Sequence, residues 1–255
     1  MGAMYLSVVI PAYNEEKRIA ATLEALAVGI PSQFYPYEVI VVNDGSGDRT
    51  AAEVTRLQRD MPNLSLINLE QNCGKGRAVA VGMLAAQGAY LLFMDADLST
   101  PLTEVPRIMH WLESGWDLAI GSRALPQSVI EIHQPLFREW MGKIFNRLVR
   151  WLVIPGILDT QCGFKGFRRE AAEVIFSHLA TARFGFDVEV LLWARHWGFR
   201  VKEVPIRWRN APYSRVSPLT DSWEMFWALV RLKRGFQRRV ATYRGNLPLF
   251  ELARK

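Results

Sequence analysis

Cysteine is scarce in this chain of 255 residues, which contains only Cys73 and Cys162. The two cysteines form no C-x-x-C pair and lie in no cluster with histidine. This argues against a disulfide framework and a structural zinc site, and it fits a reducing compartment. The first residues also lack a basic segment followed by an apolar stretch, so we expect no secretory signal.

Long apolar runs are absent as well. A helix that spans a membrane needs about 18 or more consecutive apolar residues. Residues 91–94 run into Asp95, and residues 151–154 run into Pro155 and Gly156. We therefore expect no membrane-spanning helix, although an amphipathic helix could still lie on a membrane surface.

Two glycine-rich nucleotide-binding signatures are also missing. The P-loop pattern G-x-x-x-x-G-K-[ST] does not occur, which argues against a Walker-type nucleotidase. No G-x-G-x-x-G follows the first apolar segment, residues 5–10, which argues against a dinucleotide-binding domain.

Positive charge is concentrated at the C-terminal end of the chain. The formal net charge is +6, and residues 205–255 contain 11 Lys and Arg against three acidic residues, whereas residues 1–204 have a net charge of −2. Such an end suits an anionic partner: nucleic acid, a membrane surface or a phosphorylated substrate. Because no zinc-finger or helix-turn-helix signature is present, we expect no nucleic-acid partner.

Apolar segments alternate with segments of helical periodicity through the first 120 residues. The pattern predicts strands over residues 5–10, 37–42, 64–69, 90–94 and 117–120. It predicts helices over residues 15–28, 48–60, 76–87 and 103–113, with Asp48 as an N-cap. Continuous apolar strands separated by helices are typical of an α/β domain with a mostly parallel sheet and helices on both faces.

Polar side chains follow the predicted strands at the edge where such sheets bind ligands. Asp95 and Asp97 come directly after the fourth strand, and a pair of carboxylates there suits Mg²⁺ or Mn²⁺ with substrate phosphate oxygens. The alternative is a solvated loop with two acidic residues. Asp44, after the second strand, could accept a hydrogen bond from a nucleotide base or cap the next helix. Residues 72–77, with two glycines and two cations, could hold a phosphate.

These motifs together resemble family 2 inverting glycosyltransferases with the GT-A fold. The matching segments are residues 8–16 (VVIPAYNEE), 41–46 (VVNDGS), Asn72 with residues 74–76 (GKG), 95–97 (DAD) and 121–123 (GSR). A narrower resemblance is to the dolichyl- or polyprenyl-phosphate β-glucosyltransferase branch. It rests on residues 95–100 (DADLST), 159–165 (DTQCGFK), 186–189 (FDVE), 204–205 (VP) and 214–216 (SRV).

The resemblance implies a metal-dependent hexosyltransferase with a Rossmann-like, mostly parallel GT-A sheet. It implies transfer of glucose from UDP-glucose to a polyprenyl or dolichyl phosphate, with Mg²⁺ or Mn²⁺ on Asp95 and Asp97. Two alternatives stay open: GDP-mannose as the donor, and a soluble or saccharide acceptor. Mannosyl-transferring relatives carry Gln where this chain has Ser99, so a third metal ligand at that position is in question.

The resemblance also assigns residues to the substrates. Those implied to bind the nucleotide sugar are Pro11, Tyr13, Glu15, Asp44, Lys75, Asp95, Arg123 and Arg215. Those implied to act in catalysis are Asp97, Asp159 and Arg215. Asp159 would line the acceptor side and orient the attack; the alternative is that it holds the turn of its loop.

Two segments mix aromatic and basic residues in a way that suits a membrane surface: residues 136–154 and 223–239. Ordinary core packing with a solvated basic face is the alternative for both. We expect a GT-A domain over residues 1–217 and a basic amphipathic helical tail over residues 218–255. The expected location is the cytoplasm, peripheral on the cytoplasmic face of a membrane, and the sequence makes no prediction of the oligomeric state.

Overall fold

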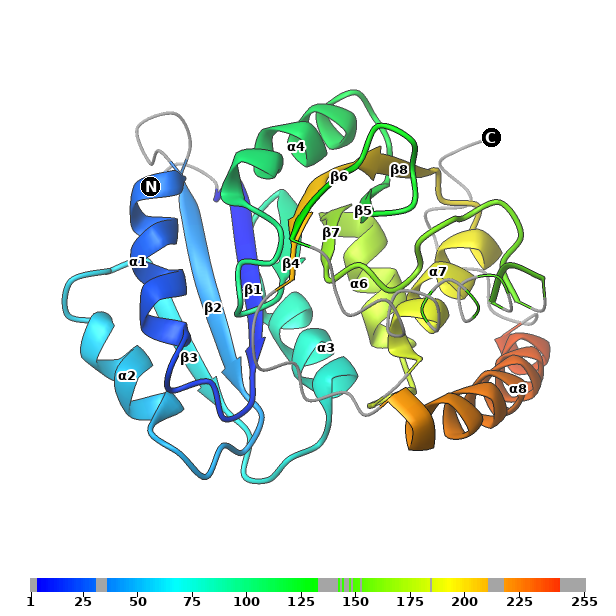
Figure 1. The fold of residues 1–255 in the computed structure, drawn as a ribbon, viewed down its shortest axis with the longest axis horizontal. Helices are drawn as coiled ribbons and strands as arrows, with labels where there is room; N and C mark the ends of the chain where they lie inside the picture. The colour runs from blue at the N-terminus through cyan, green and yellow to red at the C-terminus, as the bar shows by residue number, and fades with distance from the viewer. Residues whose placement is uncertain are drawn as a thin grey trace.

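A seven-stranded sheet forms the centre of the molecule (Figure 1). This computed structural model describes residues 4–30, 36–132, 142, 144, 147, 149–151, 153–183, 185–210 and 218–243, with the side chains of residues 229–241 in the last of these ranges. The strand order is β3-β2-β1-β4-β7-β5-β8. The strands are β1 (Leu6–Ala12), β2 (Tyr37–Asn43), β3 (Leu64–Asn68), β4 (Tyr90–Met94), β5 (Leu118–Ser122), β7 (Phe164–Arg168) and β8 (Val201–Pro205).

All neighbouring strands pair in parallel except at β7, which is antiparallel to both β4 and β5. The alternation of apolar strands and helices predicted the five parallel strands β1 to β5 but not β7. Lys165 and Gly166 interrupt the apolar pattern of β7, so the segment does not read as a buried strand. The fold class expected from the sequence is confirmed, with one antiparallel strand inserted into the sheet.

Helices cover both faces of the sheet, as predicted. Val8, Ile10 and Val41 lie on the face covered by α1 (Ile19–Gly29), α2 (Thr50–Leu57), η1 (Leu102–Glu104) and α4 (Val105–Glu113). Val9 and Val42 lie on the opposite face, which packs on α3 (Lys75–Ala85), α6 (Arg169–Ser177) and α7 (Phe186–His196). This alternation follows the pleat of each strand and explains why the central strands are apolar throughout.

Side-chain bonds delay the start of the first two helices relative to the prediction. The backbone N–H of Glu15 donates to Thr50 Oγ1 at 2.7 Å, and that of Glu16 donates to Asp48 Oδ2 at 3.2 Å. These residues therefore belong to a loop, and α1 begins only at Ile19. The N-cap of α2 is Arg49, one residue after the predicted Asp48. Asp48 still accepts the backbone N–H of Thr50 at 2.9 Å and so supports the first turn of the helix.

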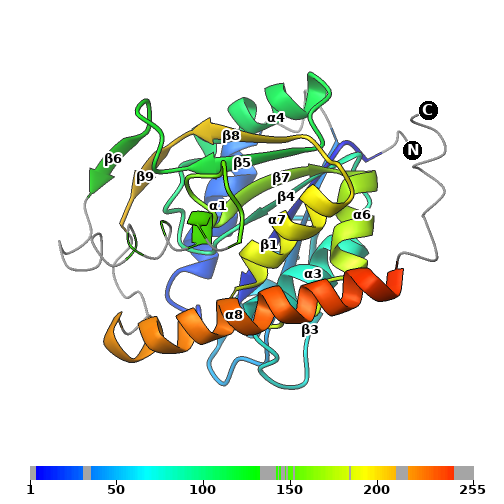
Figure 2. The ribbon, with the colours of Figure 1, turned by 90° about the vertical axis from the view of Figure 1, so that its right-hand side faces the viewer.

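A small sheet and a long helix complete the fold. Strands β6 (Val129–Ile132) and β9 (Arg207–Arg209) pair in parallel. Helix α8 (Pro218–Tyr243) runs along the underside of the molecule in Figure 2, beside α7. Its Leu229, Leu232 and Phe236 are buried in the core cluster that contains α7. No helix in the described part of the chain combines the length and the apolar character needed to cross a membrane.

Candidate active site

The loops that follow β1 and β2 are locked together at the carboxyl edge of the sheet. Asn14 donates its backbone N–H to Ser46 Oγ, and its Oδ1 accepts the backbone N–H of Gly47, both at 2.9 Å. Asn14 has a positive φ of 54°, which Asn tolerates better than most residues. The adjacent Tyr13 is 41% exposed, so its ring lies on a braced loop and remains open to a ligand.

Two further residues predicted to contact the donor lie beside Tyr13. Pro11 is half-buried within β1 and pairs in register with Val42 of β2. The carboxylate of Glu15 is bound by the guanidinium of Arg18, with Nε 2.7 Å from Oε2. All three predicted residues therefore lie along one strand and its loop.

Asp44 organises the turn that follows β3. Its Oδ1 accepts the backbone N–H of Cys73 at 2.7 Å, and its Oδ2 accepts that of Gly74 at 2.8 Å and Nδ2 of Asn72 at 3.1 Å. Asp44 is buried, and these bonds satisfy both oxygens. It caps neither α2 nor an isolated turn. It holds the turn of residues 72–74 against the end of β2.

The same turn delivers Lys75 to the end of β4. Lys75 Nζ lies 2.5 Å from Asp95 Oδ1, although its side chain is still 42% exposed. Partial desolvation works to lower the pKa of Lys75, but the charges of Asp95 and Asp187 outweigh it and raise that pKa. Lys75 is therefore a full positive charge at neutral pH.

Asp95 and Asp97 lie on a tight turn at the end of β4. Asp97 Oδ1 accepts the backbone N–H of Ser99 at 2.9 Å, and Leu98 between them has a φ of 51°. A leucine in this left-handed region is strained, and such strain is concentrated at functional sites.

Gly163 packs directly against Asp95. A Cβ on Gly163 would lie 2.1 Å from Asp95 Oδ2, and its carbonyl accepts the backbone N–H of Asp95 at 3.2 Å. Only glycine fits here, so the segment before β7 sets the position of the Asp95 carboxylate.

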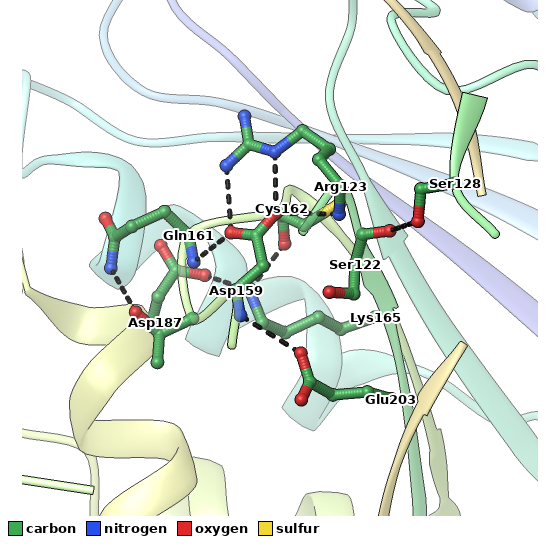
Figure 3. Close-up of polar contacts among 10 residues, drawn as sticks. Ser122, Arg123, Ser128, Asp159, Gln161, Cys162, Lys165, Asp187 and Glu203 are labelled. Carbon is green, nitrogen blue, oxygen red and sulfur yellow. Dashed lines mark hydrogen bonds and ion pairs between the residues drawn. The ribbon is translucent and has the colours of Figure 1, made fainter. Parts of the chain in front are cut away.

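Arg123, which follows β5, and Asp159 form a bidentate ion pair (Figure 3). Arg123 Nε lies 2.7 Å from Asp159 Oδ2, and Nη2 lies 2.9 Å from Oδ1. The backbone N–H of Arg123 and that of Gln161 also donate to the Asp159 carboxylate. Burial alone would raise the pKa of Asp159, but the guanidinium of Arg123 outweighs it and holds that pKa at about 2. The same pair raises the pKa of Arg123 above its ordinary value, against the effect of desolvation.

Asp159 is bound on both sides by its own loop and by Arg123. The residue is only 1% exposed, and both carboxylate oxygens are taken up by Arg123 and the loop. Its predicted place on the acceptor side stays a prediction. The structure favours the alternative, in which Asp159 holds its loop, and adds that it positions Arg123. The predicted contact of Arg123 with the nucleotide sugar stays a prediction. The side chain of Arg123 is 28% exposed.

Two charged residues at this site, one buried and one half-buried, were given no role by the sequence reasoning. Lys165 is fully buried, and its Nζ lies 2.5 Å from Asp187 Oδ1 and from the carbonyl oxygen of Cys162 (Figure 3). Glu203 of β8 accepts the backbone N–H groups of Leu158 and Asp159 at 2.8 and 3.0 Å. The available signal was a charged residue within each strand, which does not reveal a partner 22 or 44 residues away.

Comparison with known proteins decides the family. The sequence profile of glycosyl transferase family 2 matches residues 7–176. The chain is 37% identical over 243 residues to a dolichyl-phosphate beta-glucosyltransferase of Dictyostelium discoideum, covering 90% of this chain and 74% of that protein. This chain belongs to glycosyltransferase family 2.

Relatives with the same name occur in other organisms. Proteins named dolichyl-phosphate beta-glucosyltransferase from Homo sapiens and Saccharomyces cerevisiae are 36% and 34% identical, over 86% and 95% of this chain and 71% and 78% of their own lengths. The resemblance to this branch of family 2, drawn from the sequence motifs, is confirmed.

Solved structures confirm the GT-A fold of this family 2 glycosyltransferase. Glucosyl-3-phosphoglycerate synthase from Mycobacterium tuberculosis, in complex with Mn²⁺, UDP and glucosyl-3-phosphoglycerate, aligns with a TM-score of 0.67 at 19% identity, covering 90% of this chain and 80% of that one. A complex of that synthase with Mg²⁺ and UDP aligns with a TM-score of 0.66 at 20% identity, covering 90% and 79%.

Asp95 and Asp97 fit a divalent cation that takes its remaining ligands from substrate and water. Among the described residues, no group of three or more His, Cys, Asp or Glu could enclose a metal. Mg²⁺ often binds one or two protein carboxylates and keeps phosphate and water oxygens. The carboxylate of Asp95 already holds the cationic group of Lys75, which shows that the position favours positive charge.

Some predicted residues lie outside the part of the chain that the structure describes. Arg215 is one of them. The side chains of Trp223, Phe226 and Trp227, which we expected to form an apolar helical face, also lie outside it, as do most residues of the segment 136–154.

Proposed function

We propose that this family 2 glycosyltransferase transfers glucose from UDP-glucose to a polyprenyl or dolichyl phosphate, with inversion at the anomeric carbon. The observation that carries the proposal is the meeting of Lys75, Asp95 and Asp97 at the carboxyl edge of the sheet. One ammonium beside two carboxylates suits a diphosphate and its metal. The acceptor and the sugar follow from relatives that carry the dolichyl-phosphate beta-glucosyltransferase name.

The donor would lie across the ends of β1, β2 and β4. Asp95 and Asp97 would hold Mg²⁺ or Mn²⁺, which neutralises the charge that develops on the diphosphate as the glycosidic bond breaks. Lys75 would add a fixed positive charge, and Arg215 a second one. Base and ribose would contact Tyr13 and the neighbouring residues Pro11 and Glu15, while Asp44 shapes the turn beneath the diphosphate.

The acceptor needs no strong base. The second pKa of a phosphate monoester is about 6, so the group is mostly a dianion at neutral pH. One of its oxygens attacks the anomeric carbon as the bond to the UDP oxygen breaks, and UDP leaves with the bonding electron pair. Asp159 acts in this scheme by fixing Arg123, whose guanidinium supplies positive charge near the phosphates.

We also propose that the protein works as a peripheral protein at the cytoplasmic face of a membrane, where a lipid phosphate is accessible. Arg231, Lys233 and Arg234 of α8 are exposed. Trp151 is 81% exposed, and the neighbouring Val153 lines one groove with Lys233 and Arg234. A surface that combines basic residues and an exposed tryptophan is suited to an anionic lipid interface.

A panel of donors and acceptors tests the proposed function. Purified protein is incubated with Mg²⁺ and either UDP-glucose or GDP-mannose, and with either a short polyprenyl phosphate or a soluble phosphorylated acceptor. We expect a β-linked glucosyl polyprenyl phosphate, detected by mass spectrometry and anomeric NMR. Preference for GDP-mannose, or transfer only to the soluble acceptor, would overturn the proposal in favour of that alternative.

A further inference from the structure

Helix α7 contacts the donor site at one end and α8 further along. Its first turn lies beside Lys75, whose Nζ is 6.0 Å from the centre of the Phe186 ring. Two turns later, Trp193 packs edge-on against Phe236 of α8, with ring centres 4.7 Å apart. Residues near both ends of one rigid helix therefore touch the proposed diphosphate site and the C-terminal helix.

Glu189 lies between these two contacts and is completely buried. Its Oε1 accepts hydrogen bonds from the backbone N–H of Ala180 at 3.1 Å and from Nε1 of Trp193 at 3.2 Å. Its Oε2 accepts the backbone N–H of Thr181 at 2.7 Å. The remaining partner is Arg239 of α8, whose Nη2 lies 2.6 Å from Oε1. An ionised carboxylate in such a place depends strongly on its cation, because removing one partner of a buried pair leaves an uncompensated charge.

Glu189 anchors the backbone of Ala180 and Thr181. The segment of residues 180–183 packs against the turn of residues 72–77, the donor turn. The carbonyl of Ala182 accepts the backbone N–H of Arg77 at 3.1 Å, and Arg183 Nη2 donates to the carbonyl of Asn72 at 3.2 Å.

Residues 180–183 and the donor turn are closely packed. A Cβ on Gly74 would lie 2.6 Å from the Ala182 oxygen, and one on Gly76 would lie 2.5 Å from the Thr181 oxygen. Residues 180–183 therefore touch the turn of residues 72–77 closely enough to set its position.

We propose that Glu189 is a positioning residue through which the packing of α8 on α7 sets the position of the donor turn. The coupling runs from Arg239 to the Glu189 carboxylate, then to residues 180–183, and then to the turn that carries Lys75. With Arg239 in place, Glu189 holds the amides of Ala180 and Thr181. Without it, the carboxylate loses its cationic partner and reorients, and those amides lose their fixed acceptor. The proposal rests on the proposed donor site at Lys75.

The consequence is that a helix remote in sequence controls donor affinity. Arg239 lies 164 positions after Lys75 and makes no contact with it in the structure. Any event that lifts α8 from α7 would then weaken donor binding, and bound donor would favour the seated helix, because coupling between two sites is reciprocal.

The test uses the full chain, with UDP and Mg²⁺ as the probe in isothermal titration calorimetry. We expect Arg239→Gln to weaken UDP binding by about tenfold, within the usual range of coupling between sites. Arg239→Lys, which keeps the charge, should restore most of the affinity. Arg195→Gln is the matched control, because Arg195 is exposed on α7 and its loss changes the net charge equally.

Hydrogen exchange gives a second readout that does not depend on activity. In Arg239→Gln, the amides of residues 180–183 and 72–77 should exchange faster than in the wild type, while those of β1 and β2 stay unchanged. Glu189→Gln should produce the same pattern, and the double variant should be no weaker in UDP binding than either single variant. If Arg239→Gln does not fold, Glu189→Gln replaces it as the variant that breaks the pair and is compared with the wild type and with Arg239→Lys.

The outcomes separate this proposal from the proposed function. If the wild type does not bind UDP, the donor site itself is wrong. If the wild type binds UDP and Arg239→Gln binds it equally well, the coupling is wrong and the donor site stands. Equal weakening by Arg239→Gln and Arg195→Gln would also overturn the coupling, since net charge would then explain both.

Discussion

Lys75 Nζ lies 2.5 Å from Asp95 Oδ1, which ties the first residue of α3 to the carboxyl end of β4. The contact joins residues that are 20 positions apart and places a positive charge beside the carboxylate pair of Asp95 and Asp97. Other residues fix both partners. Asp44 bonds the turn that precedes Lys75, and Gly163 packs against the carboxylate of Asp95. Such preorganised charge is the kind that stabilises a leaving diphosphate without a cost at the moment of reaction.

Replacing Lys75 by methionine should slow transfer while leaving the fold intact. Methionine keeps the length of the side chain but removes the charge, and loss of one preorganised charge or donor costs on the order of 10²-fold in rate. The measurement is kcat/KM for the nucleotide sugar, with circular dichroism as the check of folding. Lys17→Met is the control, because Lys17 is an exposed cation of the first loop. Equal rates for Lys75→Met and Lys17→Met would remove Lys75 from the site.

Asp97→Ala should abolish transfer. A direct metal ligand supplies several kcal/mol of transition-state stabilisation, so its removal should leave roughly a thousandth of the activity or less. Asp60→Ala serves as the control, since Asp60 is exposed in the turn that follows α2. Activity is measured over a wide range of Mg²⁺ and Mn²⁺ concentrations. Near-normal turnover of Asp97→Ala at saturating metal would contradict the assignment of Asp97 as a ligand.

Asp159→Asn should destabilise the protein, and the deficit should depend on pH. The folded-state pKa of about 2 lies below the ordinary value of 3.8, so the ion pair stabilises the fold above about pH 4 and this contribution fades between about pH 4 and pH 2. A shift of this size corresponds to about 2 kcal/mol. Urea unfolding at pH 7 should show a deficit of that order, and the deficit should shrink as the pH falls below 4.

The control for this prediction is Asp60→Asn, which removes an exposed carboxylate. A deficit for Asp159→Asn that does not change between pH 7 and pH 3 would show that the charge of Asp159 is not what stabilises the loop.

Much of the fold could be predicted from the sequence, because strands and helices are indicated by patterns among neighbouring residues. The strands from β1 to β5 and their helices follow from apolar runs and helical spacing, which neighbouring residues determine. Strand β7 could not be predicted, since Lys165 is buried only because Asp187 and the carbonyl of Cys162 receive its charge. That partnership is created by the tertiary structure and leaves no periodic trace in the sequence.

The site shows the same division. The position of Asp95 and Asp97 after an apolar strand was sufficient to locate the candidate metal ligands. The bonding partners of Asp44 and Asp159 were not predictable, because each carboxylate bonds residues about 30 positions away that spacing alone does not bring together. In both cases an acidic residue expected to touch substrate holds a neighbouring segment in place.

The exposed basic residues of α8 should hold the protein on anionic membranes. Each basic residue near an anionic surface contributes about 1 kcal/mol, and screening by salt weakens the attraction. Leu229, Leu232 and Phe236 are buried against the body, so deletion of the helix would damage the core. Charge reversal is the sharper change. Arg231→Glu with Arg234→Glu should reduce sedimentation with vesicles that contain phosphatidylserine by at least about tenfold.

The double variant Lys17→Glu with Arg59→Glu is the matched control, because it reverses the same number of exposed charges on another part of the surface. We expect it to sediment as the wild type does at low salt, and we expect all binding to fall as salt rises. Arg239 should contribute little, since its guanidinium is engaged with Glu189. If the wild type stays in the supernatant with anionic vesicles at low salt, the peripheral membrane location is wrong. A soluble acceptor then becomes the better hypothesis, because a lipid phosphate would be reached only from a membrane-bound enzyme.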